Sequence, residues 1–214
     1  MYNHEILGLG GERVVRPDPV HPDTWVRKEK RDGQEQPLRE VKAGFYLTKI
    51  LHLLYPENVP DVHQASGHVL VAERKDLGPD HALLNEEVRR YEEGEDVSED
   101  FRKQTALAKQ RLLEDSRVRE VIRMFEQCGV SIDDAAVNFG VDQNGNAIYV
   151  DAFEPWREQK GNSLKPGYDT QALRQAIMAI EDDVKQKSGL HWLDRLDHLF
   201  AEEEHERREG HLDA

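Results

Sequence analysis

The chain has 214 residues, enough for one domain of ordinary size or for two small lobes that share a core. Lysine and arginine number 29 against 43 aspartates and glutamates, so the formal net charge is −14 and a broad nucleic-acid-binding surface is not expected. Three tryptophans, six phenylalanines and six tyrosines can anchor a core, which argues against full disorder.

The sequence contains no expected signal peptide, no apolar stretch long enough to span a membrane and one cysteine. The first residues show no basic region followed by an apolar run, so no signal peptide is expected. The most apolar stretch, residues 45–55, is too short to span a bilayer and contains Lys49 and His52. The single cysteine, Cys128, excludes an intrachain disulfide and is interpreted as a plain core residue. We therefore expect a soluble, cytoplasmic protein with no membrane partner.

The first part of the chain is predicted to form short strands and one helix. A strand that begins at Ile6 runs into a glycine-rich turn, and further strands are expected at residues 14–16, 25–28, 61–66 and 68–73. Pro37 can open a helix because its missing N–H costs nothing in the first turn. Apolar residues then keep helical spacing from Val41 to Leu54. These patterns predict a five-stranded antiparallel sheet with one helix.

The rest of the chain is predicted to be mainly helical. Residues 85–127 are expected to be helical, with a break at Gly94 and the acidic run of residues 92–96, and further helices are expected at residues 169–187 and 191–206. Gly129 is a plausible C-cap, and the Asn144-Gly145 pair predicts a tight hairpin between two short strands. The charged tail from Glu202 is expected to fray. The predicted fold class is α+β.

The most specific motif covers residues 131–138 and is followed, after the predicted hairpin, by Asp151. Asn138 follows Asp133 by five residues, and Asp151 follows Asn138 by 13 residues. Oxygen-bearing side chains of this kind suit a hard divalent cation. The motif resembles the catalytic loop and the metal-binding aspartate of protein kinases and of the smaller phosphotransferases related to them.

The resemblance implies a protein-kinase-like two-lobe fold. Residues 1–76 would form a nucleotide-binding lobe with a small antiparallel sheet and one helix, and residues 77–214 would form a reduced helical lobe. Asp133 would be the catalytic base, which orients the acceptor hydroxyl and takes its proton. Asn138 and Asp151 would hold Mg²⁺ across the phosphates of ATP.

A lysine and a glutamate would complete the catalytic set. Lys28 would contact the α- and β-phosphates and pair with Glu40 of the first helix. Lys30 lies on the same face of the strand and is a rival for this role. Asp134 is likewise a rival to Asp133, since neighbouring residues in an extended loop point apart, but the kinase spacing favours Asp133.

Other residues of the first lobe would bind the nucleotide. Three glycines would form the turn over the phosphates, because a residue without Cβ lets backbone N–H groups approach: Gly8, Gly10 and Gly11. Val15 would cover the adenine, and Ala72 would stand at the back of the pocket. Glu73 would begin the hinge, whose backbone would read the adenine edge.

Several positions depart from the kinase pattern. Arg13 stands in place of the third glycine, Ser131 and Ile132 in place of the usual histidine and arginine, and Ala135 in place of a lysine. No Ala-Pro-Glu motif follows the metal-binding aspartate. In size and element order the chain is similar to the bacterial PhoP-regulatory-network proteins.

The primary hypothesis is a small phosphotransferase that uses ATP and Mg²⁺, with a protein hydroxyl or a small molecule as the acceptor. The alternative, favoured by the motif departures, is a pseudokinase that binds nucleotide and regulates a protein partner. A third hypothesis is an acidic protein that mimics nucleic acid for a nucleic-acid-binding partner. Nucleic acid itself is not an expected partner.

Overall fold

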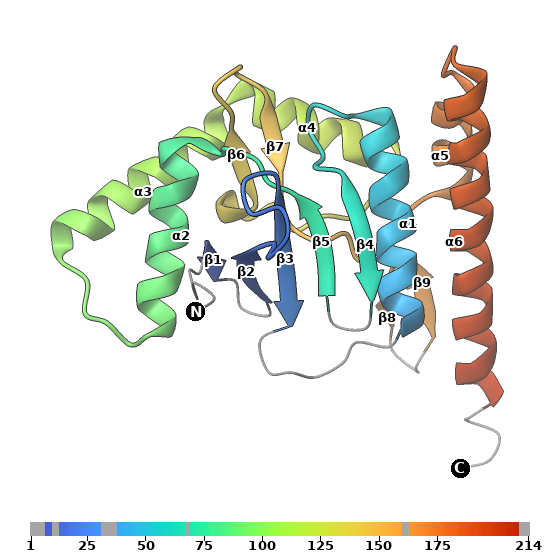
Figure 1. The fold of residues 1–214 in the computed structure, drawn as a ribbon, viewed down its shortest axis with the longest axis horizontal. Coiled ribbons are helices and arrows are strands. Elements are labelled where there is room, and N and C mark those ends of the chain that lie inside the picture. Colours follow the sequence, from blue (N-terminus) through green and yellow to red (C-terminus); the bar gives the residue numbers. More distant parts are fainter. Residues whose placement is uncertain (1–6, 10–12, 31–37, 67–68, 160–162, 210–214) are drawn as a thin grey trace.

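The computed structural model describes residues 7–9, 13–30, 38–66, 69–159 and 163–209, and Figure 1 shows how their elements are arranged. The N-terminal strands form a five-stranded antiparallel sheet in the order β1-β2-β3-β5-β4. They are β1 (Gly8–Leu9), β2 (Arg13–Pro17), β3 (Trp25–Lys30), β4 (Val62–Ser66) and β5 (Val69–Glu73). The predicted sheet is therefore confirmed. Strand β5 lies between β3 and β4, and its first four residues are apolar and buried, so both of its faces are covered.

Helix α1 (Leu38–Leu54) packs between the sheet and α6 (Asp183–Glu209), as Figure 1 shows. Helix α6 can approach Leu53 of α1 and Ile177 closely because residue 189 of α6 is a glycine. A Cβ there would lie 2.8 Å from Leu53 Cδ2 and 2.9 Å from Ile177 Cγ2. The predicted break between two C-terminal helices at residues 187–191 is wrong, since α6 runs through it without interruption.

The other helices have clear start signals. They are α2 (Gly78–Glu92), α3 (Glu99–Glu114), α4 (Ser116–Gln127) and α5 (Thr170–Met178). The side chains of Ser98, Asp115 and Asp169 cap α3, α4 and α5 by accepting hydrogen bonds from first-turn N–H groups. Helix α2 begins earlier than the predicted Asn85, because Pro79 occupies its first turn.

Two hairpins complete the chain. The first pairs β6 (Phe139–Val141) with β7 (Ala147–Tyr149), and its turn has Gly145 at φ 85°, as the Asn-Gly signal predicts. A short 3₁₀ helix, η1 (Ala136–Asn138), leads into β6. The second hairpin pairs β8 (Trp156–Glu158) with β9 (Leu164–Pro166) and was not predicted. The α+β class is confirmed.

The main hydrophobic core joins α1 to the C-terminal elements. At its centre Phe125 of α4 is fully buried, with its ring centroid 6.2 Å from that of Tyr55, 5.5 Å from Tyr149 and 5.3 Å from Phe153. Cys128 is buried in the same cluster, as predicted. A smaller cluster lies under the sheet and contains Val26, Val62, Leu70 and Ala72. Helix α1 therefore carries apolar contacts from the sheet into the main core.

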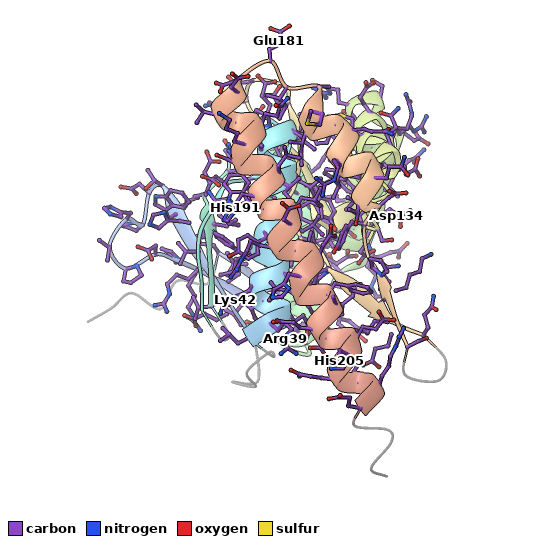
Figure 2. The ribbon with its side chains drawn as sticks, turned by 90° about the vertical axis from the view of Figure 1, so that its right-hand side faces the viewer. Arg39, Lys42, Asp134, Glu181, His191 and His205 are labelled. Atoms are coloured by element: carbon purple, nitrogen blue, oxygen red, sulfur yellow. The ribbon has the colours of Figure 1, made fainter. Side chains whose placement is uncertain are left out.

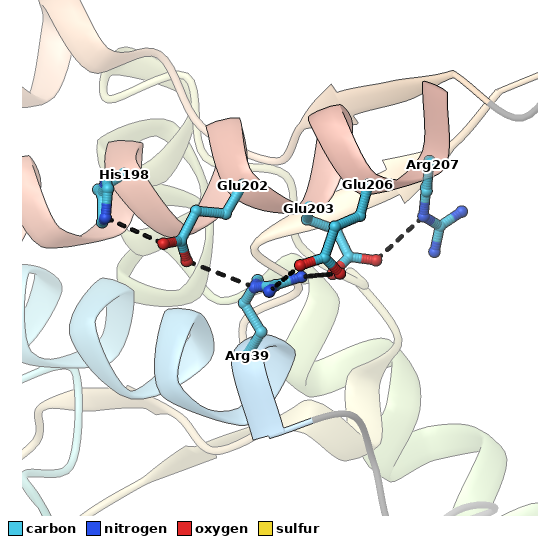
Figure 3. A network of polar contacts seen from close by, with 6 residues as sticks. All are labelled: Arg39, His198, Glu202, Glu203, Glu206 and Arg207. Atoms are coloured by element: carbon cyan, nitrogen blue, oxygen red, sulfur yellow. Dashed lines mark hydrogen bonds and ion pairs between the residues drawn. The ribbon is translucent and has the colours of Figure 1, made fainter. Parts of the chain in front are cut away.

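The last turns of α6 stay helical to Glu209, so the predicted fraying from Glu202 is wrong. Arg39 of α1 pairs with carboxylates of these turns, which removes part of their mutual repulsion. Figure 2 looks onto α6 and shows Arg39 beside its C-terminal part, and Figure 3 shows the contacts closely. Among the described helices, none combines the length and the apolar character needed to cross a membrane.

Candidate functional site

A cavity of about 1090 Å³ lies between the sheet, α1, α2 and the segment of residues 133–155. This volume is slightly above the range of about 300–1,000 Å³ that is usual for small-molecule sites. Seven residues that the sequence predicted for the site line this cavity: Val15, Lys28, Glu40, Glu73, Asp133, Asn138 and Asp151. Residues from distant parts of the sequence therefore line the same cavity.

The sheet contributes a row of residues to the cavity wall. Lys28 of β3 stands directly opposite Val15 of β2 on one side and Leu70 of β5 on the other. Residues paired in this way point to the same face of an antiparallel sheet. All three line the cavity, so the amine is flanked by apolar side chains.

The Lys28 amine also reaches across the cavity. Its Nζ donates a hydrogen bond to the backbone oxygen of Val150, the residue before Asp151. Glu40, in the first turn of α1, lines the same cavity. Lys30 ends β3, but its side chain lies outside the described residues.

The loop that carries Asp133 is held in shape by its own hydrogen bonds. The Asp133 carboxylate accepts a bond from Ala135 N at 3.1 Å, and Asn138 Nδ2 donates to the Asp133 backbone oxygen at 3.1 Å. The amide nitrogen of Asn138 is thus used by the loop, which leaves its oxygen as the group that can face a cation. Both aspartates are exposed, but among the described residues that line the cavity Asp133 is present and Asp134 is not.

Asp151 follows β7, and the buried side chain of Tyr149 interacts both with the charge of Asp151 and with the backbone of Asp133. Burial, and next the Asp151 charge, raise the pKa of the Tyr149 hydroxyl, while a hydrogen bond with the Asp133 backbone opposes this rise. The phenol therefore stays neutral and touches the backbone of the loop. Asp151 Oδ1 accepts a bond from Ala152 N at 2.8 Å, which orients its carboxylate.

His81 of α2 lines the cavity and was not predicted. Its side chain is buried, and its two nitrogens lie 3.0 Å from Phe139 O and 3.0 Å from Asn85 Nδ2. Because Asn85 Nδ2 donates to Nε2, Nδ1 carries the proton and donates to Phe139 O. Burial lowers the pKa of His81, the Phe139 bond raises it, and the nearby Lys28 charge lowers it further. A neutral His81 thus links α2 by a hydrogen bond to Phe139, the residue that follows Asn138.

The segment after β5 forms the opposite edge of the cavity. Ala72 is buried, pairs with Val26 and belongs to the smaller apolar cluster of the sheet. It is not among the described residues that line the cavity, whereas Leu70 of the same strand is. Glu73 N donates to Asp61 O at 2.8 Å, and the Glu73 carboxylate pairs with a neighbouring lysine. Residues 73–78 then lead along the cavity into α2.

The glycine turn can be followed only in part. Gly8 lies in β1 and pairs with Val15, whose side chain lines the cavity. Gly10 and Gly11 lie outside the described residues, so their predicted place over a ligand stays a prediction.

The charge of the cavity wall is negative. The acidic lining residues are Asp23, Glu40, Glu73, Asp76, Glu86, Asp133, Asp151 and Glu154, and the basic ones are Lys28, Arg74, Lys75 and Arg89. Hydrogen bonds from Arg89 and then Arg90 lower the pKa of Glu86 to about 2, so this carboxylate is ionised at neutral pH. A bound cation would reduce the repulsion between this wall and an anionic ligand.

Within the described part of the chain, no group of three or more histidine, cysteine or acidic side chains forms a ready metal site. Asn138 and Asp151 offer two oxygen ligands, which is the kind of partial set that Mg²⁺ uses when phosphates and water complete its shell. No protein-family model matches the chain, and the curated proteins contain no significant match to it. Functional inference therefore depends on the geometry of the cavity.

Proposed function

We propose that the protein is a small phosphotransferase of the protein-kinase-like fold, which binds ATP with Mg²⁺ in this cavity. The observation that carries the proposal is that Lys28, Asp133, Asn138 and Asp151 line the same cavity, with the Lys28 amine bonded to the residue before Asp151. The nucleotide-binding lobe would comprise residues 1–76, and the catalytic lobe residues 77–214.

The order of the elements gives independent support. In protein kinases the phosphate-binding lysine lies on the third strand and its glutamate partner on the helix that follows. Here Lys28 lies on β3 and Glu40 on α1. The loop with Asp133 and Asn138 then precedes a hairpin that ends at Asp151.

The chain's own residues divide the chemistry between them. Lys28 would bind phosphate oxygens, and its bond to the Val150 carbonyl would keep it next to Asp151. Asn138 and Asp151 would hold the cation, which when bound neutralises phosphate charge in a cavity whose wall is itself acidic. Asp133 would accept the acceptor's hydroxyl proton as the new O–P bond forms and the bond to the leaving ADP breaks.

A nucleotide-binding pseudokinase is the second candidate. It is favoured by Ser131 and Ile132, which replace the histidine and arginine before the catalytic aspartate. In this case the cavity would bind ATP with Mg²⁺ without transferring phosphate, and the protein would act on a partner protein.

Calorimetric titration with ATP, combined with an assay of labelled phosphate release or transfer, tests the proposal. Wild-type protein should bind ATP when Mg²⁺ is present and lose this binding in EDTA. Asp151→Asn should weaken Mg²⁺-dependent binding at least about tenfold, because it removes the charged cation ligand. Asp133→Asn should keep binding and lose transfer.

Asp134→Asn is the matched control, since Asp134 is the neighbour of Asp133 but is not among the residues that line the cavity. It should bind and turn over ATP like the wild type. ATP binding by every variant except Asp151→Asn, with no phosphate transfer by the wild type, would favour the pseudokinase. Wild-type protein that binds no ATP at millimolar concentration would contradict both candidates.

A further inference from the structure

The C-terminal turns of α6 are tied to α1 by one arginine. Arg39 Nη2 lies 2.6 Å from Glu206 Oε1 and Nη1 lies 2.8 Å from Glu206 Oε2, which makes a two-pronged contact. Arg39 Nη1 also lies 3.0 Å from Glu203 Oε2, and Nε lies 3.5 Å from Glu202 Oε2. Figure 3 shows the guanidinium of Arg39 among these three carboxylates.

The same cluster extends to a second segment of the chain. Glu203 has a side chain only 15% exposed, and its Oε1 accepts a bond from Arg207 Nε at 3.0 Å. Arg207 Nη1 then lies 2.7 Å from Glu158 Oε1 of β8. Trp156 of β8 packs near Phe200 of α6, with ring centroids 6.3 Å apart. Glu203 thus lies at the centre of a network that joins α1, α6 and β8.

Both ends of this network adjoin the cavity. Arg39 immediately precedes Glu40, which lines the cavity from the first turn of α1. Strand β8 begins at Trp156, directly after the cavity-lining residues 151–155. A first helical turn has few hydrogen bonds of its own, so an outside contact decides how firmly it is held.

We propose that Arg39 and Glu203 are positioning residues for the cavity, because they hold the Glu40 turn of α1 and the segment after Asp151 against α6. The inference rests on the proposed function for its link to nucleotide binding, but its structural part stands on the contacts alone. The outer carboxylates of the network, Glu206 and Glu158, are exposed, and ion pairs with exposed partners add little to global stability. The network should therefore affect the placement of these two segments more than the unfolding midpoint of the protein.

Glu203→Gln tests the inference, with Glu204→Gln as the matched control. Glu204 is the next residue of α6 and pairs with Arg208 of its own helix, 2.5 Å away, without joining α1 to β8. Amide hydrogen exchange, read separately for residues 42–45, 156–158 and α4, measures the placement of the segments, because the amides of residues 42–45 donate to the carbonyls of the first turn of α1. The affinity for ATP with Mg²⁺ measures the consequence for the cavity.

In Glu203→Gln, exchange should become at least about fivefold faster in residues 42–45 and in residues 156–158, while α4 and the urea midpoint stay unchanged. ATP affinity should fall at least about threefold, and Arg39→Lys should weaken it less than Arg39→Gln, because lysine keeps the charge without the two-pronged contact. Glu204→Gln should match the wild type in every measurement.

Unchanged exchange in either segment, faster exchange throughout the chain, or unchanged ATP affinity would each overturn the inference. A wild type that binds no ATP is a different result, since it contradicts the proposed function. In that event the exchange data alone decide whether Glu203 holds the two segments.

Discussion

The buried histidine of α2 gives the sharpest stability prediction. His81→Phe keeps a ring of similar size but removes both hydrogen bonds, to Phe139 O and from Asn85 Nδ2. Phe139 is fully buried, so its carbonyl would lose its partner away from solvent, whereas Asn85 is half-buried and can reach water. One buried unpaired group costs about 1–3 kcal/mol, and we expect that loss in the free energy of unfolding at pH 7.5.

The cost of His81→Phe should depend on pH. The pKa of His81 is lowered in the folded protein from an ordinary value of 6.5, mainly by burial. Below pH 6.5 the unfolded chain therefore binds a proton that the folded protein does not bind, and the wild type loses stability as the pH falls. The loss is at most about 1.4 kcal/mol per pH unit. Phenylalanine does not titrate, so the difference between the two proteins should shrink under acid conditions.

Urea unfolding followed by tryptophan fluorescence at pH 7.5, 6.5 and 5.5 measures this difference. His191→Gln is the control, since His191 is exposed on α6 and its replacement should change stability at pH 7.5 by less than about 0.5 kcal/mol. A difference between wild type and His81→Phe that stays constant from pH 7.5 to 5.5 would refute the assignment of a neutral, buried His81.

Three further predictions concern packing. Gly140→Ala should lower the free energy of unfolding by about 1–3 kcal/mol, because its Cβ would lie 2.5 Å from Leu77 Cβ and 2.7 Å from Leu77 O; an unchanged urea midpoint would contradict this. Phe125→Ala should cost about 3–5 kcal/mol in a denaturant titration, since the ring is fully buried, and a cost below about 1 kcal/mol would disagree with the core described above. Cys128 is 2% exposed and burial raises the pKa of its thiol, so a thiol reagent should label it far faster in urea than in buffer, and equal rates would disprove the burial.

Local patterns predicted the elements that depend on nearby residues. Short apolar runs between turn residues located the strands of the N-terminal sheet. The Asn144-Gly145 turn located the β6–β7 hairpin, because the positive φ of Gly145 is a local requirement. Motif spacing selected Asp133, Asn138 and Asp151, and all three line one cavity.

Elements that depend on distant contacts were missed. The β8–β9 hairpin has strands of three residues with no Asn-Gly turn, and Trp156 is placed by its contact with Phe200 rather than by a local pattern. The break expected between residues 187 and 191 is absent, because α6 runs through Gly189, where a small residue lets the helix approach Leu53.

Two polar features were also out of reach of sequence reasoning. The charged end of α6 looked unstable because its main partner, Arg39, is distant in the sequence. His81 precedes the predicted helix start at Asn85, and nothing local marks its role, since the carbonyl of Phe139 that it binds belongs to another element. The end of α6 and His81 each depend on a partner that is distant in the sequence and lies beside them only in the folded chain.

A crystal structure with a non-hydrolysable ATP analogue and Mn²⁺ tests the central claim most directly, because the anomalous signal of the metal locates the ion. The account predicts one ion bound by the amide oxygen of Asn138 and the carboxylate of Asp151, with the phosphates between it and the Lys28 amine. A nucleotide bound outside the cavity, or an ion that touches neither Asn138 nor Asp151, would contradict it.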